Sequence, residues 1–219
     1  MMRGILALAV LAVLSACSHD VYTPVTPATN IYSSYTDKIP GHWLATVEPP
    51  ATGGTIKVTG YICSAHDFPL TADTAYLESV RKTLLNVFEE VETVPAEPLD
   101  KEAETLRTAG ALGLIRVEHA AIEPRVTFVP GFFVGTAQAD ADMSARVTVD
   151  GPDGRLYGSK VDGRGSATSD GECNAGAPAL SQAISKAMLD MMEDLGERLS
   201  NAEQLRSLPK TQASSAPTS

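Results

Sequence analysis

The chain has 219 residues, of which 43% are hydrophobic and 5% aromatic, so it can bury one largely aliphatic core. Its formal net charge of −10 excludes the basic surface that binding to nucleic acid or to anionic lipid headgroups requires. We therefore expect a single domain with tails and no nucleic-acid partner.

The first sixteen residues have the features of a secretory signal. Arg3 precedes an apolar run that begins at Ile5, and the small residues Ser15 and Ala16 stand directly before Cys17. The apolar run is too short to span a bilayer. We therefore expect residues 1–16 to be a signal peptide that is removed.

The sequence Leu14-Ser15-Ala16-Cys17 resembles the lipobox of bacterial lipoproteins. The resemblance implies lipidation of Cys17, and in that family a serine such as Ser18 favours export to the outer membrane. Several acyl chains anchor stably, at about 0.8 kcal/mol per buried methylene. The expected location is the periplasmic face of the outer membrane of a Gram-negative bacterium, with the lipid as the membrane contact. An ordinary signal peptide that happens to contain a cysteine is the alternative.

Composition divides the mature chain into three parts. Residues 17–39, after the lipidated Cys17, are rich in Thr, Pro, Ser and Tyr, which predicts an extended tether. Residues 40–205 are expected to form a single α+β domain. Residues 206–219 have little to bury, which predicts a disordered tail.

In the first half of the domain, apolar periodicity predicts two strands at residues 40–47 and 55–63, followed by a loop at 64–70. Apolar residues at three- and four-residue steps then predict an amphipathic helix from residue 71 to about residue 91, with Leu77 on its buried face.

The second half contains the clearest hairpin signal, because the turn residues 151–154 separate two alternating stretches. A long stripe of apolar residues after Pro178 predicts the closing helix. The other predicted elements are a short helix at 100–109, a strand at 114–122, and an interrupted strand or protruding turn at 126–134.

This order predicts an α+β fold with a mainly antiparallel sheet and two long amphipathic helices packed on one face. Together with the lipobox and the closing-helix segment Ala183–Asp190, it resembles the YajG-type family of small bacterial lipoproteins. It is also similar in outline to the lipopolysaccharide-assembly lipoproteins. The resemblance implies a fold and a location, and it supplies no catalytic residue.

Two cysteines remain once Cys17 is assigned to lipid. Unused thiols in an oxidising periplasm usually pair, so Cys63 and Cys173 are expected to form a disulfide. In the chain-entropy model, closing a loop of about 100 residues contributes about 4.7 kcal/mol. Two separately buried free cysteines are the alternative.

Reactive residue types also gather at Cys63, His66 and Asp67, which leaves an envelope hydrolase as an alternative function. A catalytic thiol needs an oriented base, and a zinc site needs three or four suitably spaced ligands; the sequence offers neither pattern. We therefore expect no enzyme, no metal site and no cofactor.

A candidate contact surface comes from Phe128, Phe132 and Phe133 around Pro130-Gly131. An exposed apolar patch of this kind marks a protein or lipid contact, whereas packing over the sheet edge is the alternative. The expected function is a non-enzymatic binding or assembly module with an envelope partner or a second copy of itself. Binding of a lipid or glycolipid in the gap between helices and sheet is a further alternative, and no particular small-molecule ligand is indicated.

Overall fold

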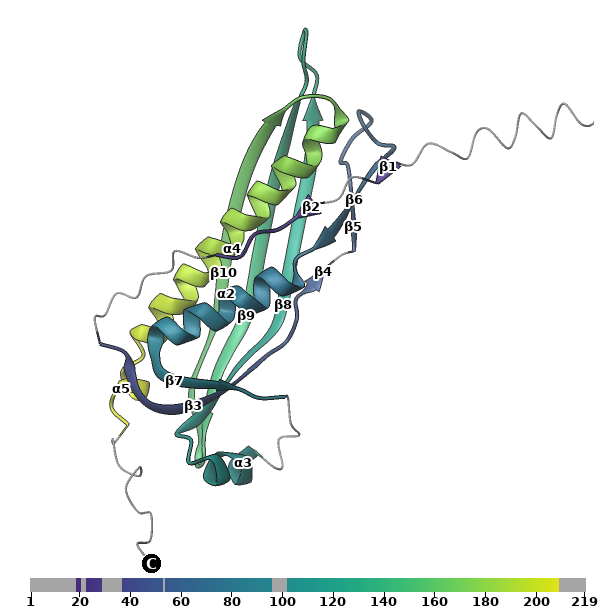
Figure 1. Ribbon diagram of the computed structural model, residues 1–219. Helices are drawn as coiled ribbons and strands as arrows, with labels where there is room; N and C mark the ends of the chain where they lie inside the picture. The colour runs from purple at the N-terminus through teal and green to yellow at the C-terminus, as the bar shows by residue number, and fades with distance from the viewer. Residues whose placement is uncertain (1–18, 21–22, 29–36, 53, 96–101, 209–219) are drawn as a thin grey trace, which may run out of the picture.

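A computed structural model describes residues 19–20, 23–28, 37–52, 54–95 and 102–208 (Figure 1). The predicted signal peptide and Cys17 lie outside the described residues. So do residues 29–36 of the predicted tether and 209–219 of the predicted tail.

Among the described residues, six strands form the main sheet. They are β3 (Ile39–Val47), β4 (Ala51–Thr52), β7 (Phe88–Thr93), β8 (Gly113–Val129), β9 (Thr136–Gly151) and β10 (Gly154–Asp170). The order is β10-β9-β8-β3-β7, with β4 also paired to β8. The long strands β8, β9 and β10 are antiparallel, whereas β3 pairs parallel with both β7 and β8. The sheet is therefore mixed, and its antiparallel part contains the predicted hairpin.

A smaller described sheet is built around one central strand. Its members are β1 (His19–Asp20), β2 (Thr23–Pro24), β5 (Thr55–Lys57) and β6 (His66–Thr71). β6 pairs parallel with β1 and β2 and antiparallel with β5. The N-terminal segment thus adds strands to the domain.

Two long helices cover one face of the main sheet. The described helices are α2 (Asp73–Val87), α3 (Glu102–Ala109), α4 (Gly176–Ser200) and α5 (Glu203–Arg206). Figure 1 shows α4 running along the length of the long strands, with α2 beside it on the same face. The fold is α+β, as predicted.

Small residues bring α4 very close to β10. A Cβ atom on Gly163 would lie 2.2 Å from the carbonyl oxygen of Ala187, and one on Gly165 would lie 2.1 Å from that of Ala183. Backbone therefore meets backbone at this contact, which we call the β10–α4 seam. The expected gap between helix and sheet is closed here, and the alternating residues of β9 are buried beneath: Ala137, Ala139, Ala141, Met143, Ala145, Val147 and Val149.

The predicted strand at 55–63 and loop at 64–70 are wrong in their boundaries. The strand β5 ends at Lys57, and residues 66–70 of the expected loop lie in β6 (His66–Thr71). The chain turns between them because Gly60 and Cys63 have positive φ angles of 123° and 60°. These φ angles lie outside the extended region, so the chain leaves the strand direction at these residues.

The predicted helix at 71–91 is too long at its C-terminal end. α2 ends at Val87, and the following residues form β7 beside β3. Phe88 is fully buried there, with its ring centroid 5.1 Å from that of Trp43. Packing against the tryptophan and pairing with β3 thus override the helical pattern. Leu77 is 37% exposed, so it does not lie on the buried face as expected.

The described part of the predicted tether is extended but packs on the domain. Thr23 and Ala28 are buried, and the backbone N–H of Ala28 donates to Ser79 Oγ at 2.9 Å. Ser181 Oγ on α4 donates to the carbonyl of Pro24. The packed structure therefore begins before the predicted domain boundary at residue 40.

Candidate functional site

The turn between β8 and β9 presents two phenylalanines to solvent. Val129 pairs with Thr136, so residues 130–135 extend beyond the last pair of the ladder, and Figure 1 shows this hairpin projecting past α4. Phe132 is 94% exposed and Phe133 is 91% exposed. Their rings meet edge to face, with centroids 4.7 Å apart. Both rings therefore lie on a protruding turn, and neither packs over the sheet edge.

The tight path of this turn depends on Gly131. A Cβ atom at this position would lie 1.8 Å from the carbonyl oxygen of Val134, which is an impossible approach. A residue with a side chain would force the turn to open. The local sequence Pro130-Gly131 thus sets how the two rings are displayed.

Phe128 does not belong to the exposed surface, contrary to expectation. Its side chain is 8% exposed, and a Cβ atom on Gly176 would lie 3.1 Å from its ring. Phe128 therefore packs at the start of α4, because alternation along β8 turns it to the covered face.

A second apolar loop lies at the same end of the molecule. Residues 58–65 join β5 to β6, and within them Tyr61 is fully exposed while Ile62 is about half exposed. Neither residue was predicted to be part of a contact surface, because both lie within the strand expected at residues 55–63. The signal that could have shown the turn is Gly60, which interrupts the β-branched run.

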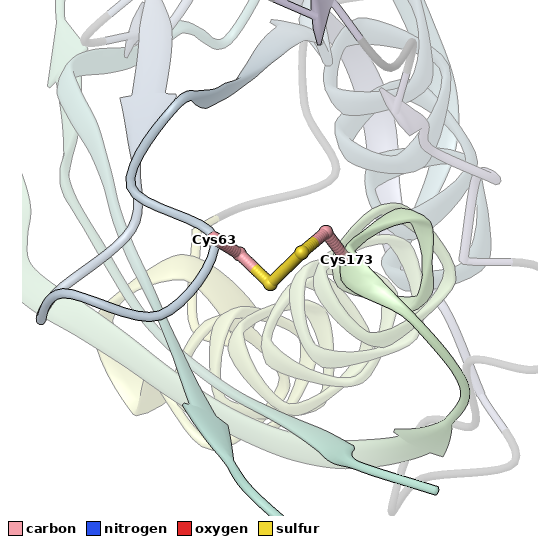
Figure 2. The surroundings of a disulfide bond; sticks show 2 residues. All are labelled: Cys63 and Cys173. Carbon is pink, nitrogen blue, oxygen red and sulfur yellow. A yellow bond between two sulfur atoms is a disulfide. The ribbon is translucent and has the colours of Figure 1, made fainter.

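A disulfide bond fastens this loop to the start of α4. Cys63 and Cys173 are bonded, with their Cα atoms 5.4 Å apart, and the bridge closes a separation of 110 residues. Figure 2 shows the bond joining the loop to the short helical turn that precedes α4. The structure therefore pairs the two cysteines that the sequence left for a disulfide.

The two loops border a cavity of about 760 Å³. Ile62 and the disulfide line one side, and Phe128, Phe133 and Val134 line the other. The exposed apolar residues around it are defined here as the apolar tip: Tyr61, Ile62, Val129, Phe132, Phe133 and Val134.

The loops of the apolar tip carry no charge, although the chain is strongly acidic. Residues 58–65 and 129–136 contain no Asp, Glu, Lys or Arg. Next to them, Lys57 Nζ lies 2.9 Å from Asp67 Oδ1, so these flanking charges neutralise each other. The loops are thus suited to an apolar contact, and the exposed Glu172 is the charged carboxylate at the cavity between them.

The N-terminal strand brings the chain's start to this same end. The Cα atom of His19 in β1 pairs with that of His66 in β6, and His66 lines the cavity together with Phe133. The described chain therefore begins beside the apolar tip.

The residues considered for catalysis are brought close but are not arranged as a nucleophile and base. Cys63 is bonded to Cys173 and so has no thiol. His66 and Asp67 are adjacent on β6, so their side chains point to opposite faces, and Asp67 is paired with Lys57. In the described part of the chain, His, Cys, Asp and Glu do not gather in groups of three or more that could hold a metal ion. The described helices also lack the combined length and apolar character of a membrane-spanning segment.

No family model and no curated protein matches the sequence. Among solved structures, this chain is similar to the Xanthomonas campestris protein XCC0632 of the DUF330 family, with a TM-score of 0.47, 8% identity and coverage of 85% of this chain and 97% of that chain. A putative neuraminyllactose-binding hemagglutinin homolog from Helicobacter pylori has a TM-score of 0.44 and 13% identity, over 84% of this chain and 97% of that chain. The PelC dodecamer from Paraburkholderia phytofirmans has a TM-score of 0.29 and 15% identity, over 78% of this chain and 94% of that chain. At these scores and identities, the likenesses carry no argument about function.

Proposed function

We propose that the chain is a lipid-anchored, non-enzymatic lipoprotein of the bacterial outer membrane, which faces the periplasm and binds or assembles envelope components. The observation that carries the proposal is the uncovered, uncharged apolar tip on an otherwise acidic domain. Exposed aromatic side chains gathered at one site are typical of a contact surface. The lipobox-like sequence at Cys17 supplies the anchor.

The anchor is tested by replacing Cys17 with serine in the full-length chain. The wild type should be processed, enter the detergent phase on phase separation, and give a mature N-terminal peptide whose mass includes acyl chains. Cys17→Ser should leave an unprocessed form or a form in the aqueous phase.

The matched control is the double variant Cys63→Ser, Cys173→Ser, which loses two cysteines but keeps Cys17. It should partition like the wild type. Normal processing and unchanged partitioning of Cys17→Ser would contradict the anchor.

The non-enzymatic part of the proposal draws support from the disulfide and from the Lys57–Asp67 pair, which occupy the residues considered for a hydrolase. Its test is His66→Ala, assayed on envelope ester and peptide substrates beside the wild type. Hydrolysis by the wild type that is lost in this variant would contradict the proposal.

A second candidate function is binding of a lipid or glycolipid, favoured by the cavity between the two loops. Its largely apolar lining includes Ile62, Phe128 and Val134. The proposed lipid site is this cavity, and not the gap between helices and sheet that was expected from the sequence. Mass spectrometry of lipid extracted from the purified chain tests this function. A stoichiometric lipid that is lost in Val134→Asp but kept in the control Leu77→Asp would support it.

A further inference from the structure

We propose that the apolar tip inserts into the bilayer in which the lipid on Cys17 anchors the chain. The domain then contacts the membrane at two adjacent points. The occupant of the surface is the phospholipid acyl region of that membrane. This inference rests on the lipid anchor of the proposed function, and it adds the orientation of the domain.

The first described residues lie close to the apolar tip. Cys17 precedes His19 by two residues, and two residues span at most about 7 Å. His19 is held beside His66 through the pairing of β1 with β6. Because His66 borders the same cavity as Phe133, an acyl chain on Cys17 is attached close to the apolar tip.

The chemistry of the apolar tip carries the second step. Phe132 and Phe133 offer apolar rings, and Tyr61 offers an apolar ring with a polar end, which suits the boundary between acyl chains and water. Neither loop contains a charged residue that would have to leave water. Neither loop contains Lys or Arg to attract anionic headgroups, so insertion should not depend on salt.

The rigidity of the apolar tip carries the third step. The Cys63–Cys173 bond holds one loop, and the close approach of Gly131 to Val134 shapes the other. A surface that is already ordered loses little conformational entropy when it is covered.

A second copy of the chain fits the apolar tip less well than a bilayer does. A stable protein interface uses about 20–30 residues on each side. The apolar tip consists of six residues at the end of two loops, which is a narrow surface for a dimer. Insertion of a narrow tip into a fluid bilayer has no such size requirement.

The experiment places a fluorescent probe at the apolar tip of the full, lipidated chain. Phe133→Trp is reconstituted into phosphatidylcholine vesicles that contain brominated acyl chains, which quench tryptophan on contact. The natural Trp43 is fully buried and gives an unquenched background. The matched control is Leu85→Trp, because Leu85 is an exposed apolar residue on α2, which lies away from the β8–β9 turn in Figure 1.

We expect the emission of Phe133→Trp to shift to shorter wavelength and to be quenched several-fold more than that of Leu85→Trp, equally at low and high salt. If the lipidated chain floats with the vesicles but both probes are quenched alike, the inference is wrong while the anchor stands. If the chain carries no acyl mass and does not float, both the lipid anchor and the insertion of the apolar tip are wrong. A blue shift without bromine quenching, together with dimers in sedimentation, would overturn the inference in favour of self-association.

Discussion

Gly163, Gly165, Ala183 and Ala187, where the two backbones meet at the β10–α4 seam, and the residues of the apolar tip are all uncharged, but the two regions differ in what covers them. At the seam, glycines and alanines let two backbones meet, and the surrounding apolar side chains are buried. At the apolar tip, the side chains are large aromatic or aliphatic groups, and no other described part of the chain covers them. The comparison indicates that the seam holds the fold together, whereas the apolar tip is available for a contact outside the chain.

Apart from the control variants, the largest effect on stability is expected at the seam. Gly165→Ala places a Cβ against the backbone of α4, so the helix must move and the free energy of unfolding should fall by about 3 kcal/mol. Urea unfolding measures the change. The matched control is Gly158→Ala on the same strand, where the new Cβ would meet its nearest neighbour at 3.9 Å. Equal losses in the two variants would show that the close approach at the seam does not matter.

The next largest effect is expected from the bond that joins the two regions. In the double variant Cys63→Ser, Cys173→Ser, the free energy of unfolding should fall by about 2–3 kcal/mol, because the unfolded chain is no longer constrained by a long loop. A reductant should weaken the wild type by a similar amount and leave the double variant unchanged. Alkylation of both cysteines in the wild type without reductant would show that the disulfide is not formed.

A smaller effect is expected from a polar group inside the covered region. The Tyr76 hydroxyl is buried and has no hydrogen-bond partner among the described residues. Tyr76→Phe should therefore raise the free energy of unfolding by about 1 kcal/mol at neutral pH, as measured in urea. Unchanged or lower stability would indicate that the hydroxyl is satisfied.

The same tyrosine predicts a pH dependence. Burial, and to a smaller extent Glu48, raises the pKa of Tyr76 above its ordinary value of 10.0. Below this ordinary pKa, Tyr76 is neutral in both the folded and the unfolded state, and its contribution to stability is fully present. As the pH rises above it, the phenol ionises first in the unfolded state, so the free energy of unfolding falls. The alkaline loss of stability should be smaller in Tyr76→Phe than in the wild type.

The smallest effect on stability is expected at the apolar tip. Phe132→Ser and Phe133→Ser should each change the free energy of unfolding by no more than about 0.5 kcal/mol, since both rings are already exposed. At least one of them should reduce membrane or partner recovery. Phe128→Ser is the control, because truncating this buried ring should lower the free energy of unfolding by about 3–5 kcal/mol. A melting temperature lowered by many degrees in both tip variants would identify them as core residues.

The parts of the fold that could be predicted are those with long, regular patterns. The hairpin of β9 and β10 follows from clean alternation around a strong turn, and α4 follows from an apolar stripe that persists over its length. The strands β6 and β7 could not be predicted, because they are short and because β7 pairs with β3, and β6 with β1 and β2, all far away along the chain. The docking of residues 23–28 depends on hydrogen bonds to Ser79 and Ser181, which no local pattern encodes.

The candidate site was predictable only in part. Adjacent phenylalanines cannot both enter one face of a strand, which favoured an exposed ring at Phe132 or Phe133. Tyr61 and Ile62 join them only because β5 and β6 form a hairpin and Cys63 is bonded to the start of α4. Such a meeting of loops is a tertiary contact, so it could not be read from either loop alone.

Insertion of the apolar tip can be measured by hydrogen exchange of the lipidated chain with and without phospholipid vesicles. Exchange on membranes should be slower in residues 58–65 and 129–136, with no change in peptides from β10 and α4. Unchanged exchange in both loops, or protection confined to α3 at the other end of the long strands in Figure 1, would contradict the claim that the apolar tip is the membrane-facing surface.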